Sequence, residues 1–156
     1  MTTSVQQILQ NKGSAIHAVA PGSSVFTALE LMARHDIGSV LVTEGARLIG
    51  IFTERDYARK VVLHGLNSKN ATVGELMTQN ILTVSPSHTI EDCMAIMTNN
   101  RFRHLPVVEK GEIAGIVTIG DVVKAVITDQ SNTINQLHGY IAGDLQTGTP
   151  HGLLIS

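Results

Sequence analysis

The sequence GIFTERD at residues 50–56 returns as GIVTIGD at residues 115–121. Gly, Ile, Thr and Asp occupy the same positions in both copies, which are offset by 65 residues. An apolar run followed by Thr-x-x-Asp is typical of a strand that passes directly into a helix, because threonine caps a helix start and an acidic residue three positions later completes the cap. The two stretches therefore predict two strand-to-helix junctions of the same construction.

The same offset aligns the two halves of the chain without a gap from Val19/Val84 to Val61/Val126. In each half, a short apolar segment and a proline precede residues at helical spacing, and two apolar runs around a glycine-bearing turn follow. Each half is thus predicted to be a β-α-β-β-α unit. The predicted strands cover residues 16–19, 40–42, 48–52, 81–84, 105–108 and 113–117, and the predicted helices cover about 25–33, 55–64, 90–97 and 120–128.

A unit of roughly 55 residues is small for independent stability, so we expect the two units to share a core. The predicted fold is α/β, with two β-α-β-β-α repeats packed as a pseudo-twofold pair and an additional C-terminal helix that carries Ile134, Leu137 and Ile141. The apolar face of this helix is free for a homodimer contact. We divide the chain into a first domain (5–64), a polar linker (65–72), a second domain (73–130), and a C-terminal helix with a loose tail (131–156).

The composition argues against several classes of protein. A formal net charge of −2 and the lack of tryptophan provide neither a basic field nor stacking platforms, so nucleic acid is not an expected partner. The single cysteine, Cys93, excludes an intramolecular disulfide framework and has the position of a core residue on a helix. No signal peptide and no apolar run of membrane-spanning length are visible, so we expect a cytoplasmic protein without membrane contact.

Motifs for catalysis or metal binding are not apparent in the sequence. The seven histidines follow neither HxxxH nor HExxH spacing, which predicts no metal site. A P-loop, a GxGxxG fingerprint and a nucleophile elbow are also missing. We therefore expect a protein that is not an enzyme and has no catalytic cofactor.

The junction motifs, together with Met77-Thr78, Val84-x-Pro86 and the segment RFRHLPVV at residues 101–108, resemble the CBS (cystathionine-β-synthase) domain. The resemblance covers about residues 5–130 and is strongest to stand-alone bacterial proteins that consist of a single CBS pair. It implies a pseudo-twofold module with two clefts that often dimerises. It also implies an adenine-nucleotide sensor of energy or redox state, with AMP and NAD(H) first and ATP, ADP or S-adenosylmethionine as further ligands. The downstream protein partner is not identified.

The resemblance places Asp56 and Asp121 on ribose, and Thr53 and Thr118 near phosphate. The same residues also have a purely structural interpretation as helix caps. The two roles are compatible, since capping does not use all the acceptor sites of a carboxylate. For adenine, the family analogy indicates the segments that contain Ile16, Ala18, Ile81 and Thr83, which are otherwise ordinary edge strands.

Residues 101–104 form the densest basic cluster, and their counterpart at the repeat offset is Asp36-Ile37-Gly38-Ser39. Planar guanidinium groups bind phosphate through two parallel hydrogen bonds, and the position before a strand favours Arg103 and His104 over Arg101. This asymmetry predicts two unlike clefts, for two nucleotides or for one dinucleotide with its pyrophosphate near Arg55, Arg103 and Lys12. The predicted ligand-binding residues are Lys12, Ile16, Ala18, Gly38, Ser39, Thr53, Arg55, Asp56, Ile81, Thr83, Arg103, His104, Pro106, Thr118, Ile119, Gly120 and Asp121.

Two other functions stay open at this point. The pair is an oligomerisation scaffold without a ligand, or it is a regulatory fragment of an enzyme such as inosine monophosphate dehydrogenase, in which similar pairs are embedded. A catalytic barrel takes some 250 residues, and 156 residues leave no room for one. The presence of both Thr-x-x-Asp motifs weighs against the scaffold.

Overall fold

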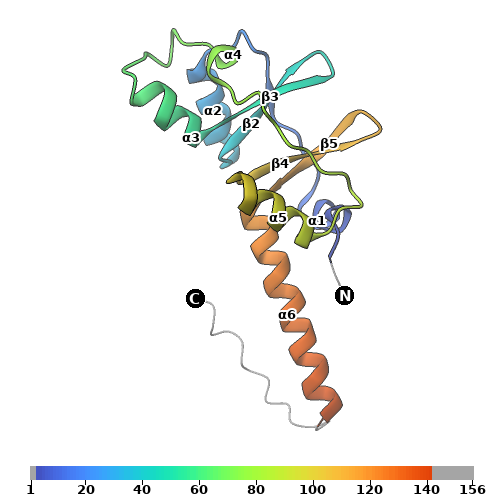
Figure 1. Cartoon of the computed structure of the whole chain (residues 1–156). Coiled ribbons are helices and arrows are strands. Elements are labelled where there is room, and N and C mark those ends of the chain that lie inside the picture. The colour runs from blue at the N-terminus through green and yellow to red at the C-terminus, as the bar shows by residue number, and fades with distance from the viewer. Residues whose placement is uncertain (1–2, 142–156) are drawn as a thin grey trace.

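A computed structural model describes residues 3–141 of the chain (Figure 1). Its element order confirms an α/β fold with two β-α-β-β-α repeats followed by a C-terminal helix. The first half contains α1 (Val5–Lys12), β1 (Ala18–Val19), α2 (Val25–His35), β2 (Ser39–Glu44), β3 (Arg47–Thr53), α3 (Glu54–Asp56) and the π-helix η1 (Tyr57–Val62). The second half contains α4 (Val73–Leu76), α5 (Ile90–Asn100), β4 (His104–Glu109), β5 (Glu112–Thr118) and α6 (Ile119–Ile141).

Each repeat is built on an antiparallel hairpin, β2–β3 in the first and β4–β5 in the second. Both hairpins have the same register and a bulge at the same place, after Val42 in one and Val107 in the other. Strand β1 adds a parallel partner to β2 through Val19. At the equivalent place in the second repeat, the predicted strand 81–84 is reduced to one parallel bridge between Val84 and Val107.

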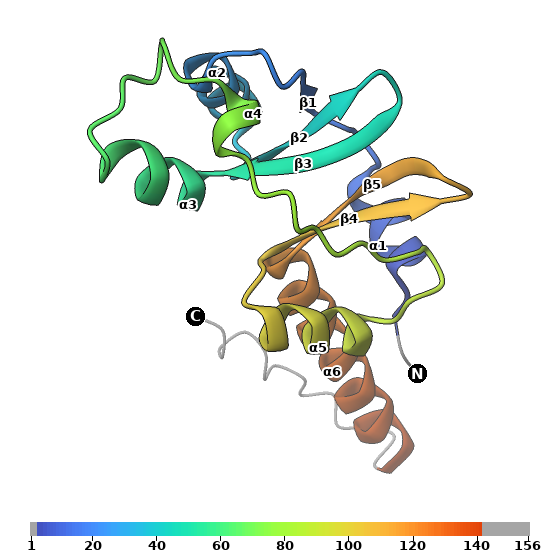
Figure 2. The same cartoon turned by 45° about the horizontal axis from the view of Figure 1, so that its top comes forward.

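The two hydrophobic cores are completed by exchange of chain segments between the repeats. We call residues 3–12 and 71–80 the leading segments, because each precedes one repeat in the sequence. Helix α1, which leads the first repeat, places Val5 and Ile8 in the core of the second repeat. Helix α4, which leads the second repeat, places Val73 in the core of the first. Figure 2 shows α1 beside β5 and α4 beside the β2–β3 hairpin.

Backbone hydrogen bonds make this exchange symmetric. Three backbone hydrogen bonds join each leading segment to the opposite repeat, and the residue of the second repeat lies 65 positions after its counterpart in the first. The residues of the two leading segments correspond to each other at an offset of 68. The two leading segments therefore dock in the same way on opposite repeats. The matched bonds are Val25 N to Ala71 O (2.9 Å) with Ile90 N to Thr3 O (3.0 Å), Val73 N to Ser23 O (2.8 Å) with Val5 N to His88 O (2.8 Å), and Gly74 N to Pro21 O (2.8 Å) with Gln6 N to Pro86 O (2.9 Å).

Two helices differ from their prediction. The helix expected over residues 55–64 consists of one short α-helical turn and the π-helix η1. The helices expected over 120–128 and beyond residue 130 form one continuous helix, α6, because no glycine or proline interrupts residues 121–138. In Figure 1, α6 runs past the rest of the fold. The tail that was expected to be loose, from about residue 143, lies outside the described residues.

Helices α1 and α4 were not predicted, although both carry a sequence signal. Ser4 and Gln7 form a capping box at the start of α1, and Thr72 and Glu75 form one at the start of α4. The hydrogen bonds from Thr72 lower the pKa of the Glu75 carboxyl. The predicted division into 5–64 and 73–130 follows the sequence, whereas each core includes one segment from the other repeat.

Removing a core side chain from α1 tests the exchange. Ile8 is only 6% exposed in the core of the second repeat, so Ile8→Ala should lower the free energy of unfolding by about 2–5 kcal/mol in urea denaturation. Gln10→Ala removes an exposed side chain from the same helix and should change stability by less than about 0.5 kcal/mol. Equal effects of the two substitutions would contradict docking of α1 on the second repeat.

Candidate functional site

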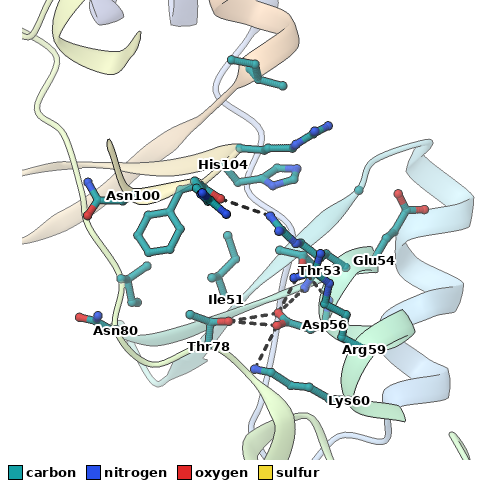
Figure 3. Close-up of a pocket in the computed structure, with 17 residues that line it drawn as sticks. Ile51, Thr53, Glu54, Asp56, Arg59, Lys60, Thr78, Asn80, Asn100 and His104 are labelled. Atoms are coloured by element: carbon teal, nitrogen blue, oxygen red, sulfur yellow. Dashed lines mark hydrogen bonds and ion pairs between the residues drawn. The ribbon is translucent and has the colours of Figure 1, made fainter. Parts of the chain in front are cut away.

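Two clefts lie between the repeats. Each combines the Thr-x-x-Asp junction of one repeat with the loop that follows helix α2 or α5 of the other. Cleft 1 surrounds Thr53 and Asp56 and has a volume of about 810 Å³ (Figure 3). Cleft 2 surrounds Thr118 and Asp121 and has a volume of about 480 Å³. Both volumes fall within the range of small-molecule sites in proteins. Gly38, His104 and Ile119 line both clefts, so the two sites are neighbours.

Asp56 is held in the lining of cleft 1 by contacts to both of its carboxylate oxygens. It accepts a hydrogen bond from the backbone N–H of Thr53 at 3.0 Å and one from the hydroxyl of Thr78 at 3.0 Å. The ammonium group of Lys60 lies 3.0 Å from Oδ1 and also donates to the carbonyl of Leu76. Asp56 is only 7% exposed, and Figure 3 shows Thr78 and Lys60 converging on it. Oδ1 and Oδ2 are thus already engaged before a ligand arrives.

Asp121, in cleft 2, has a freer carboxylate. It accepts from the backbone N–H of Thr118 at 2.8 Å and from Nζ of Lys12 at 2.7 Å. Lys12 lies at the end of α1 and also donates to the carbonyl of Ile116 at 3.0 Å. Both hydrogen bonds that reach Asp121 within residues 3–141 end on Oδ2. Oδ1 is therefore available to accept hydrogen bonds from a ligand.

His104 lies where the two clefts meet. Burial lowers the pKa of His104, and the positive charges of Arg103 and Lys12 lower it further, whereas Asp121 and Asp56 oppose the shift. The imidazole is therefore neutral at pH 7 and offers a hydrogen-bonding group without a charge. Gly38 faces it from the first repeat, and a side chain there would come within 3.5 Å of Nε2.

The basic side chains divide unevenly between the clefts. Arg55, Arg101 and Arg103 line cleft 1, and Nη1 of Arg55 donates to the carbonyl of Arg101 at 3.3 Å. Arg59 joins them there, whereas Lys12 lies in cleft 2. Lys12 lies in cleft 2 because α1 crosses to the second repeat, so the expected grouping of Arg55, Arg103 and Lys12 around one pyrophosphate stays a prediction that spans both clefts.

Most of the predicted ligand-binding residues line a cleft, but three do not. Thr83 lies in a separate groove between the two hairpin turns, Pro106 is buried within β4, and Ala18 is part of β1. Cleft 1 contains Gly38, Thr53, Arg55, Asp56, Ile81, Arg103, His104 and Ile119 from the prediction. Cleft 2 contains Lys12, Ile16, Gly38, Ser39, His104, Thr118, Ile119, Gly120 and Asp121.

Several cleft residues were missed by the sequence reasoning. Arg101 in cleft 1 and its counterpart at the repeat offset, Asp36 in cleft 2, were both missed, because Arg103 and His104 were favoured over Arg101. Thr78 belongs to the Met77-Thr78 motif of the resemblance but was not assigned to the site, and both Thr78 and Lys60 reach Asp56 only through the fold. The other missed residues are Ile51, Glu54, Arg59, Asn80, Asn100 and Phe102 in cleft 1, and Gly13, Ala15, His17, Ile37, Leu41, Gly115 and Ile116 in cleft 2.

Other groups with chemical potential have structural surroundings. Cys93 is buried in the second core, and burial raises the pKa of its thiol to about 11, so the thiol stays protonated. Among residues 3–141, no group of three or more His, Cys, Asp or Glu side chains is arranged to hold a metal ion. The same residues include no helix that is both long and apolar enough to span a bilayer.

Comparison with known proteins identifies the family. The CBS domain profile matches residues 5–63 and 73–128. A solved CBS-domain protein of Burkholderia ambifaria, provisionally assigned to signal transduction, is 48% identical, with a TM-score of 0.79 over 82% of this chain and 96% of that one. A solved CBS-domain protein of Agrobacterium tumefaciens is 42% identical, with a TM-score of 0.76 over 80% of this chain and 94% of that one.

A relative from plants also matches across most of its length. The mitochondrial CBS domain-containing protein CBSX3 of Arabidopsis thaliana is 34% identical over 151 residues, which are 91% of this chain and 73% of that protein. The bacterial relatives are stand-alone CBS-domain proteins without a catalytic domain. The chain belongs to the CBS-domain family and carries a tandem pair of these domains.

Proposed function

We propose that this CBS pair binds adenine nucleotides, AMP and NAD(H) first, in its two clefts and acts as a regulatory sensor. The observation that carries the proposal is the free Oδ1 of Asp121, which lines cleft 2 beside the capping Thr118. A carboxylate oxygen in this position can accept hydrogen bonds from the two hydroxyls of a ribose. CBS domains typically bind adenine nucleotides, which supports the same ligand class.

The surroundings of the carboxylates suit the remaining parts of a nucleotide. Arginine side chains that line cleft 1 can bind phosphate through paired hydrogen bonds. Ile16 in cleft 2 and Ile81 in cleft 1 offer apolar surface for adenine. ATP, ADP and S-adenosylmethionine share the adenosine group and remain candidates on the same grounds.

The contacts of Lys12 provide a route by which binding becomes a signal. A ribose that donates hydrogen bonds to the free Oδ1 of Asp121 shares this carboxylate with Lys12, which is bound to Oδ2 and lies at the end of helix α1. Since α1 packs in the core of the opposite repeat, a change in the Lys12–Asp121 ion pair on binding changes how the two repeats are tied together. A ligand with different contacts in two such states shifts their populations. The provisional assignment of the Burkholderia relative to signal transduction agrees with this function.

A thermal-shift screen with AMP, ADP, ATP, NAD, NADH and S-adenosylmethionine tests the ligand class. A ligand at 100 times its Kd adds about 2.7 kcal/mol to the stability of the folded state. For a chain of this size, the melting temperature should rise by roughly 5–10 °C. Uridine monophosphate provides a control with the same ribose and phosphate. If no adenine nucleotide raised the melting temperature at millimolar concentration, the ligand-free scaffold would be favoured.

Calorimetric titration with AMP tests the assigned residues. Arg103→Ala should weaken AMP binding in cleft 1 and Asp121→Ala should weaken AMP binding in cleft 2, each about tenfold or more, because each removes a charge-assisted hydrogen bond to the ligand of its own cleft. Arg34→Ala removes the same charge as Arg103→Ala from an exposed position in α2 outside both clefts, and Kd should stay unchanged. Unchanged AMP binding in both Arg103→Ala and Asp121→Ala would show that the assignment is wrong.

We further propose that the chain forms a homodimer through α6. CBS proteins oligomerise, as the hexameric CBS-CP12 protein of a cyanobacterium illustrates. Val123, Ile127, Ile134 and Leu137 lie on one face of α6 and are 46–53% exposed. The spacing of four, seven and three residues keeps these four side chains on one face, with Gln130 between Ile127 and Ile134, and such a face is one that two packed helices bury. A free-standing helix gains most of its stability from such packing.

A charge on this face tests the dimer. Ile127→Asp should convert the dimer to a monomer in sedimentation velocity at micromolar concentration, because an unpaired carboxylate is costly in an apolar interface. Thr128→Asp places the same charge on the other side of the helix and should leave the dimer intact. A dimer that survives Ile127→Asp, or a wild-type chain that is monomeric, would exclude this interface.

A further inference from the structure

The approximate symmetry of the two repeats allows the clefts to be compared position by position. Adding 65 to a residue number in one cleft gives its counterpart in the other, and Thr53 and Asp56 correspond in this way to Thr118 and Asp121. At this offset, four pairs of cleft-lining positions differ in charge. The pairs, with the cleft 1 residue first, are Arg55 with Gly120, Arg101 with Asp36, Arg103 with Gly38, and Glu54 with Ile119.

The pair of Arg101 and Asp36 is a charge inversion at a fixed backbone position. Arg101 ends helix α5 with φ 58°, and Asp36 ends helix α2 with φ 54°. Both residues therefore have the same left-handed conformation, and their side chains start from equivalent points beside their clefts. The inversion places a cation at one site where the other has an anion.

The ion pairs leave very different residual charges in the two clefts. In cleft 1, Lys60 is paired with Asp56, and none of the carboxylates described by the structure lies within ion-pair distance of the four arginines at positions 55, 59, 101 and 103. Glu54 is the remaining acidic side chain in that lining. In cleft 2, Lys12 is paired with Asp121, which leaves Asp36. Cleft 1 is therefore strongly positive, whereas cleft 2 carries a residual negative charge.

We infer that cleft 1 binds the polyphosphate tail of a nucleoside di- or triphosphate, whereas cleft 2 accepts a nucleotide of low charge such as a monophosphate. The inference rests on the proposed function, and it assigns a different ligand class to each site. The larger volume of cleft 1, about 810 Å³ against about 480 Å³, accommodates the additional phosphate groups.

The hydrogen bonds of the two aspartates agree with this assignment. Both oxygens of Asp56 are engaged by Thr53, Thr78 and Lys60, so a ribose gains less from this carboxylate than from Asp121. The affinity of cleft 1 must then come mainly from phosphate and guanidinium groups, which form short, charge-assisted hydrogen bonds in pairs. In cleft 2, the repulsion between Asp36 and a second or third phosphate excludes the longer tail.

Calorimetric titrations of the full chain with ATP and with AMP test the inference, with EDTA present so that the phosphate tail keeps its charge. ATP should bind its tighter site at least tenfold more strongly than AMP binds that site. Arg101→Asp should reduce the ATP affinity of that site about tenfold or more and affect AMP much less. Asp36→Arg, the reciprocal change, should raise the ATP affinity of the weaker site. Arg59→Ala, a milder change in the same cleft, should also lower ATP affinity more than AMP affinity.

Arg34→Asp is the matched control, since it makes the same change of charge on an exposed turn of α2 outside both clefts. If Arg34→Asp lowered ATP affinity as much as Arg101→Asp, the effect would reflect net charge alone and the inference would be overturned. Equal ATP-to-AMP ratios in the wild type, Arg101→Asp and Arg59→Ala would overturn it as well. A chain that binds neither ATP nor AMP would instead overturn the proposed function. If single-stranded RNA bound cleft 1 in preference to ATP, the inference would also be overturned, because RNA would then be the ligand of that cleft.

Discussion

The exchange of the two leading segments is the constraint on which the rest of this molecule depends. Each repeat packs its core against a helix that precedes the other repeat in the sequence, so neither core is complete without the other repeat. The glycines of the junction motifs make this close approach achievable. A methyl group at Gly50 would overlap Met77, and one at Gly115 would come 2.8 Å from Leu9. The motif glycines are thus required by packing of the exchanged segments against the sheets.

The exchanged leading segments also supply side chains to the two clefts. Lys12, at the end of one leading segment, reaches Asp121, and Thr78, near the end of the other, reaches Asp56. The segments that complete the cores therefore deliver the partners of both acidic residues. Folding and the assembly of the two clefts therefore depend on one set of contacts.

Much of the architecture could be predicted from the sequence, because the 65-residue offset makes the hairpins and their junctions visible twice. The equivalence of the two leading segments was not predicted, because they correspond at an offset of 68 and an alignment without gaps at an offset of 65 does not match them. The π-helix η1 has no signal in side-chain periodicity. The pairing of Lys12 with Asp121 joins residues 109 positions apart and follows only from the crossing of α1. The charge difference between the clefts could be predicted, but the placement of Lys12 could not.

The exchange also bears on the origin of the tandem arrangement. A single repeat whose leading segment packs as it does here would expose the face that Val5 and Ile8 now cover in the neighbouring repeat. Two copies of such a unit would satisfy each other by reciprocal swapping around a twofold axis. Duplication and fusion of the gene would then keep both partners on one polypeptide and leave each cleft free to diverge. The unlike charges of Arg101 and Asp36 are the kind of difference that a symmetric homodimer could not evolve.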